Sequence, residues 1–231
     1  ELAIMRAGYQ DVARSYVLYR EERTKARSQN AVEDLEDLPI DKSVTLEDGT
    51  TEQLNIAKLR LIISQSCQNI SDVSADAVYE AIDKNIYDGI KKEDLPSSIL
   101  ISVRPLIEKD PNYSYVVARL LLSNIYEEAL TFLGEPNKAP TLDEIGDLYP
   151  SYFKSYLVKA CELNLLDKEL LNFDLDYLCK HISADKDKAF TYLGLQTLYD
   201  RYFIHSKEIR FELPQAFFMR VAMGLAINEK N

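Results

Sequence analysis

The stretch from Ser43 to Leu59 constrains the fold more than any other part of the chain. Two short β-prone runs, Ser43–Leu46 and Thr50–Leu54, flank an Asp-Gly pair at positions 48 and 49. Asp-Gly between such runs is a strong signal for a hairpin turn, because glycine adopts a positive φ without a steric penalty. The sequence therefore predicts a β-hairpin across this stretch.

A helix is predicted to follow the hairpin directly. Asn55 stands where a helix N-cap belongs, since its short side chain can accept a hydrogen bond from the first turn. The apolar residues after it have helical spacing: Ile56, Leu59, Ile62, Ile63 and Cys67. A hairpin leading into an amphipathic helix is typical of a small module with a lid.

Three more helices are predicted before residue 134. The first ends at Tyr87-Asp88-Gly89, where glycine suits a left-handed helix stop. The second begins near Leu95-Pro96 and carries Pro105, which is expected to kink or shorten it. The third runs from about Tyr113 to Leu133 and is strongly apolar on its inner face.

Composition limits the function classes. The chain has 231 residues, 46% of them apolar, and no apolar run long enough to cross a membrane. The net charge of −11 disfavours binding to DNA or RNA. Its first residues read as a helix interior and no signal peptide opens it, so we expect a piece of a longer protein.

Cysteine and histidine usage argues against metal or disulfide chemistry. Cys67, Cys161 and Cys179 lie far apart without paired spacing, which is typical of buried thiols in a reducing cytoplasm. With only His181 and His205, a histidine metal cluster is excluded. We expect no metal site and no catalytic residue in this chain.

The two most distinctive sequence segments lie near the end of the chain. Residues 193–202 read LGLQTLYDRY and residues 212–226 read ELPQAFFMRVAMGLA. Helical core packing explains the spacing of the apolar residues in these two segments, but it does not explain the order of the residue types. They resemble the N-terminal helical domain of the class I ribonucleotide reductase large (alpha) subunit. Residues 43–133 resemble the ATP-cone, a regulatory nucleotide-binding module of the same subunit.

The start of the chain resembles the end of another ATP-cone. The closing helix of that family carries the pattern A-x-x-Y-x-x-Y-R-x-x-R. Here the matching residues are Ala13, Tyr16, Tyr19, Arg20 and Arg23. A plain helical hairpin that packs on the rest is the alternative interpretation of this segment.

The resemblance implies a mainly α fold: an ATP-cone, with a β-hairpin lid on a four-helix bundle, followed by an all-helical domain. The expected parts are the C-terminal helices of a truncated first cone (1–28), a linker (29–42), a second cone (43–133), a linker (134–141) and the reductase helical domain (142–231).

The family reduces ribonucleotides to deoxyribonucleotides with a cysteine radical, but its catalytic groups lie in a barrel and a tail that this chain lacks. The resemblance thus implies the regulatory N-terminal region of ribonucleoside-diphosphate reductase, inactive alone. The implied partners are the radical-generating small (beta) subunit, other alpha subunits, and ATP and dATP as effectors of the parent enzyme. Nucleic acid and membrane are not expected as partners.

The nucleotide site of this cone is predicted to be degenerate. The family hairpin begins Val-x-Lys-Arg-Asp-Gly, and its two cations bind the triphosphate. Leu46 and Glu47 stand at those positions here. Other family positions have become Pro96, Asn124 and Glu127. Losing two or three such contacts costs roughly 4–6 kcal/mol, or about three decades in affinity.

The remaining candidate nucleotide-binding residues are Glu52, Asn55, Lys58 and Lys92, of which Lys92 partly compensates for the lost cations. We therefore expect a cone that keeps its fold, has lost the nucleotide and acts as a spacer and contact surface.

Two alternatives come from other functional classes. One is a non-catalytic, acidic helical scaffold. The resemblance of residues 212–226 to the reductase helical domain disfavours this alternative. The other is a free ATP-cone transcription repressor, which needs a zinc ribbon of paired CxxC motifs. This chain has no such motif.

Overall fold

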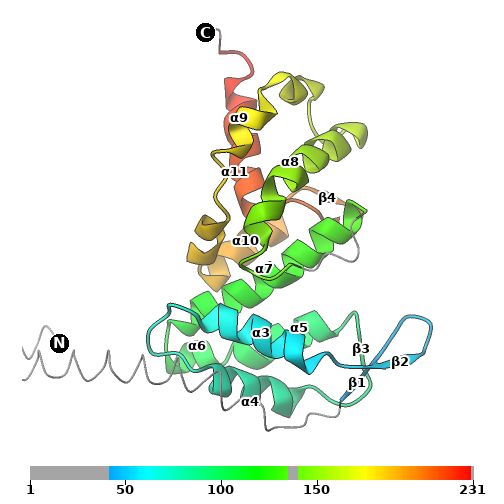
Figure 1. Ribbon diagram of the computed structural model, residues 1–231, viewed down its shortest axis with the longest axis vertical. Helices are drawn as coiled ribbons and strands as arrows, with labels where there is room; N and C mark the ends of the chain where they lie inside the picture. Colours follow the sequence, from blue (N-terminus) through cyan, green and yellow to red (C-terminus); the bar gives the residue numbers. More distant parts are fainter. Residues whose placement is uncertain (1–41, 135–139, 230–231) are drawn as a thin grey trace, which may run out of the picture.

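The computed structural model describes residues 42–134 and 140–229. The segments predicted as truncated cone helices (1–28) and most of the linker after them lie outside the described residues, as does most of the second linker. Figure 1 shows two groups of elements. The hairpin and helices α3 to α6 lie in its lower part, α8, α9 and α11 lie in its upper part, and α7 runs between them with α10 beside it.

The predicted hairpin is present. Strands β1 (Ser43–Thr45) and β2 (Thr51–Gln53) pair antiparallel, with Ser43 opposite Gln53. Gly49 takes a φ of 81° in the turn, which is the backbone state for which glycine was expected there. The Asp48 carboxylate accepts hydrogen bonds from the Thr50 amide and hydroxyl at 2.9 and 2.6 Å, which closes the turn.

A third strand was not foreseen. β3 (Ile90–Lys91) pairs parallel to β1, with Val44 opposite Ile90, so the sheet order is β2-β1-β3. Gly89 has a φ of 78°, but it is not the helix stop that the sequence suggested. Helix α4 (Ala75–Asn85) ends earlier, with extended backbone at Ile86. Gly89 instead turns the chain into β3 and donates its amide to the Ser43 carbonyl at 2.9 Å.

The other helices of the first group follow their sequence signals. Helix α3 (Ile56–Cys67) is capped by the Asn55 side chain, which accepts from the Lys58 amide at 2.9 Å. Pro105 divides the third predicted helix into α5 (Leu95–Val103) and α6 (Leu106–Lys109), because proline cannot supply the amide that a continuous helix needs. Helix α7 spans Tyr113–Phe132.

The second group is mostly helical. Its elements are α8 (Ile145–Glu162), the 3₁₀ segment η2 (Lys168–Asn172), α9 (Leu175–Cys179), the 3₁₀ segment η3 (Ala184–Ala189), α10 (Tyr192–Arg201) and α11 (Pro214–Ala226). A small hairpin of β4 (His205–Ser206) and β5 (Ile209–Arg210) interrupts the region that was predicted to be all helical.

Helix α7 belongs to both hydrophobic cores. Its residues Val116, Val117 and Leu120 pack with α3, α4 and β3. Other α7 residues, among them Leu122 and Tyr126, pack with α8, α10 and α11. A helix that is apolar nearly all round is a buried central helix, and α7 thereby fixes the two groups relative to each other.

Candidate functional site

A cavity of about 1010 Å³ lies where the two groups of elements meet. Its lining comes from the hairpin, α3, the segment after β3, α5, one side of α7, and from α10 and β5. The walls are predominantly apolar. A cavity of this size and character is typical of a small-molecule site.

All four candidate residues from the sequence line this cavity: Glu52, Asn55, Lys58 and Lys92. Each is held by a neighbour. The Lys58 ammonium lies 3.5 Å from the Glu127 carboxylate, and the Lys92 ammonium lies 3.7 Å from that of Glu52. The Asn55 side chain is occupied as the cap of α3. The structure therefore brings these residues together, but none presents an unshared charge to the cavity.

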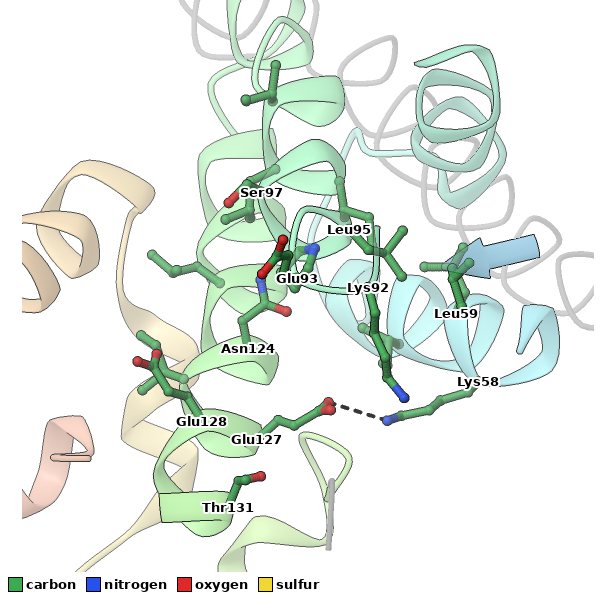
Figure 2. Close-up of a pocket in the computed structure, with 18 of the residues that line it drawn as sticks. Lys58, Leu59, Lys92, Glu93, Leu95, Ser97, Asn124, Glu127, Glu128 and Thr131 are labelled. Carbon is green, nitrogen blue, oxygen red and sulfur yellow. Dashed lines mark hydrogen bonds and ion pairs between the residues drawn. The ribbon is translucent and has the colours of Figure 1, made fainter. Parts of the chain in front are cut away.

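Figure 2 shows that the ends of Lys58 and Lys92 approach the same region of the cavity from two elements. Lys58 comes from the first turn of α3, and Lys92 directly follows β3. The Lys92 amide donates to the Thr45 carbonyl at 2.9 Å, so the unforeseen third strand sets the position of this lysine. The pairing of β3 with β1 is thus what places Lys92 opposite Lys58.

The charges that line the cavity sum to a negative value. Its acidic residues are Glu52, Glu93, Glu127 and Glu128, and its basic residues are Lys58, Lys92 and Arg104. Arg104 stacks on the Tyr192 ring at 5.3 Å. All three cations therefore already have a partner in the folded chain.

The two hairpin residues at the family's cation positions lie apart from this lining. Leu46 and Glu47 sit near the hairpin tip, and Val44 and Glu52 are the strand residues that reach the cavity. Asn124 and Glu127 do line it, together with Pro96. The acidic balance of the cavity thus comes mainly from α7 and from the segments around β2 and β3.

Sequence reasoning missed the wall supplied by the second group. Tyr192, Gln196 and Tyr199 on α10 and Ile209 on β5 line the far side. Glu128 is fixed there, because one of its oxygens accepts from the Tyr199 hydroxyl at 2.8 Å and the other from the Arg210 amide at 2.9 Å. Burial, the nearby Glu128 charge and this hydrogen bond raise the Tyr199 pKa to about 12. No local pattern links residues so distant in sequence.

The cysteines are inert packing residues. Cys161 and Cys179 are buried and Cys67 is half-buried, and all three are free thiols. Burial raises the pKa of Cys67 to about 12, which suppresses its reactive thiolate. Within residues 42–134 and 140–229, no group of three or more His, Cys, Asp or Glu side chains could hold a metal ion. In the same ranges, no helix has the length and apolar character of a membrane span.

Comparison with known families separates the chain into two recognised parts. Residues 42–128 match the ATP cone domain, and residues 188–231 match the domain described as "Ribonucleotide reductase, all-alpha domain". The chain joins an ATP cone to a ribonucleotide reductase all-alpha domain. The sequence resemblance to the reductase large subunit is thereby confirmed, as is the mainly α fold.

Known proteins are similar in sequence to this chain over most of its length. It is 37% identical over 237 residues to the ribonucleoside-diphosphate reductase subunit alpha of Chlamydia pneumoniae, an alignment that covers 99% of this chain. The subunit alpha of Helicobacter pylori strain 26695 is 30% identical over 191 residues, covering 81% of the chain. The chain spans 22% of the length of each of these relatives. The cavity described above lies between the matched ATP cone and elements α10 and β5 of the matched all-alpha domain.

Proposed function

We propose that this chain is the regulatory N-terminal region of a ribonucleoside-diphosphate reductase alpha subunit, which supplies deoxyribonucleotides for DNA replication. The presence of an ATP cone and a reductase all-alpha domain in one chain, in that order, carries the proposal. In this function the chain contributes no catalytic group. It would work in the cytoplasm with the small beta subunit and with other alpha subunits.

Within that function, the ATP cone is proposed to have lost its adenine nucleotide. Support comes from the cavity: both converging lysines are paired with carboxylates, and four acidic side chains outnumber three basic ones. A triphosphate would have to displace Glu127 and Glu52 and then lie beside them. Like charges at such short range disfavour binding.

The cone is then proposed to act as a rigid spacer and contact surface between subunits. Its attachment supports this role, since α7 carries core residues of both groups. Arg119 on α7 adds a polar link, donating to the Gln68 carbonyl at 2.6 Å and to the Lys188 carbonyl at 3.4 Å. A spacer of this kind transmits position without needing a ligand.

Titration calorimetry of this chain with ATP and dATP tests the loss of the nucleotide. We expect no saturable heat at nucleotide concentrations up to the millimolar range. Saturable binding at micromolar concentration would contradict it. The wider assignment is tested with the intact alpha subunit and its beta subunit, which together should convert a ribonucleoside diphosphate to the deoxy form.

A further inference from the structure

The two lysines of the cavity are arranged as an anion site whose anions are supplied by the protein itself. Lys58 and Lys92 come from α3 and from the end of β3, yet their ammonium groups approach the same region (Figure 2). Each is paired with a carboxylate from another element, Glu127 on α7 and Glu52 on β2. Glu127 and Glu52 therefore stand beside the lysines where a bound phosphate would stand.

We propose that Glu127 is the residue that excludes polyphosphates from this cavity, acting as a built-in anion on Lys58, with Glu52 acting in the same way on Lys92. The inference rests on the proposed function, in which the wild-type cone holds no nucleotide. It adds that the cavity still has two converging cations, Lys58 and Lys92, that could contact a polyphosphate once a carboxylate is neutralised. Neutralising one carboxylate should therefore restore binding.

Three observations single out Glu127 among the acidic residues of the cavity. Its carboxylate pairs with the lysine on α3, and its side chain is 54% exposed, so no core packing holds it in place. Glu128 differs, because both its oxygens are bound by Tyr199 and by the Arg210 amide. Glu93 is paired with Lys91 at 3.5 Å, outside the lysine pair of the cavity. Glu127 can thus be changed without disturbing the fold.

The test is titration calorimetry of this chain and its Glu127→Gln variant with ATP, dATP and inorganic tripolyphosphate. Glutamine keeps the size of the side chain and removes the charge. Releasing one charge-assisted contact should raise affinity by about tenfold or more, so we expect saturable binding of all three probes. Circular dichroism and thermal unfolding of the variant check that it folds as the wild type does.

Two further variants separate the pairing from general charge. Glu80→Gln removes the same charge from an exposed ion pair with Lys84 on α4, away from the cavity, and should bind nothing. Lys58→Ala combined with Glu127→Gln removes the released lysine and should abolish the restored binding. Equal binding by Glu80→Gln, or retained binding by the double variant, would overturn the inference.

The remaining outcomes distinguish this inference from the function on which it rests. If neither the wild type nor Glu127→Gln binds any probe, the inference is wrong and the loss of the nucleotide stands. If the wild type binds ATP as tightly as the variant does, the proposed loss of the nucleotide is wrong as well. Binding of tripolyphosphate as well as ATP would show that the phosphates, not the base, are recognised.

Discussion

Asp187 is the clearest single residue whose environment sets a measurable property. It is fully buried on η3, where its carboxylate accepts from the hydroxyls of Tyr149 at 2.7 Å and Tyr126 at 3.0 Å and from the Gln215 amide at 2.8 Å. Burial raises its pKa from the ordinary 3.8 to about 6, although these three hydrogen bonds oppose the shift. The folded chain therefore keeps this proton to a higher pH than the unfolded chain does.

This raised pKa predicts a pH-dependent stability difference between the wild type and Asp187→Asn. The folded state binds more protons than the unfolded state between pH 3.8 and about 6, so the contribution of Asp187 is full below this window and is lost as pH rises through it. Relative to the variant, the wild type should lose about 2 kcal/mol from pH 4 to pH 7. Urea unfolding of both proteins at several pH values measures it. A constant difference would show that the pKa is not raised.

Only some of the residues that line the cavity could be predicted from the sequence. Asn55, Lys58 and Lys92 were found because local patterns and a family frame point to them. Glu127 on α7, the carboxylate partner of Lys58, was noted only as a departure from the family. The pairing of Lys58 with Glu127 joins residues 69 positions apart, and only the folded chain brings them together.

At the scale of elements, three local signals predicted the structure correctly. Asp48-Gly49 made the turn, Asn55 capped α3, and Pro105 divided a helix. Strand β3 was missed because a two-residue strand has no periodicity of its own. It exists because the β1 backbone lies beside it and offers hydrogen-bonding groups, which is a tertiary effect.

Two glycines give opposite predictions because their backbones differ. Gly89 has a φ of 78°, and a Cβ at this position would lie 3.8 Å from Thr45 Oγ1, so Gly89→Ala introduces strain without a clash. We expect a loss of about 1 kcal/mol in the free energy of unfolding. Gly224 lies in α11 with open space around it, so Gly224→Ala should instead stabilise by roughly 0.5–1 kcal/mol. Thermal unfolding of the two variants side by side measures both signs, and equal effects would contradict this account.

At the scale of the whole molecule, α7 determines how the parts behave together. The sequence predicts a domain boundary between residues 133 and 142, at the expected linker, and that division stays a prediction. The two hydrophobic cores do not separate at that boundary, because residues of α7 belong to both cores. Apolar periodicity alone could not indicate this, since it shows that a helix is buried but not against which partners.

Sharing of α7 predicts a single unfolding transition for the described parts. Leu122 is fully buried in the core with α8 and α11, so Leu122→Ala should cost about 2–5 kcal/mol. The loss should appear equally in hydrogen exchange of α4 and of α8, although α4 packs in the other core. Faster exchange in α8 alone would show that the two groups unfold independently.

The root and the tip of the hairpin are held in different ways. At the root, Ser43 and Thr45 accept main-chain bonds from Gly89 and Lys92, and the Asp88 carboxylate accepts from the Ser43 amide at 2.7 Å. The tip is held by bonds within residues 46–50 alone. If the hairpin moves, it should therefore bend near its tip while its root stays hydrogen-bonded to the residues around β3. Because residues 46–50 do not line the cavity, movement of the tip would leave Lys92 in its place beside β1.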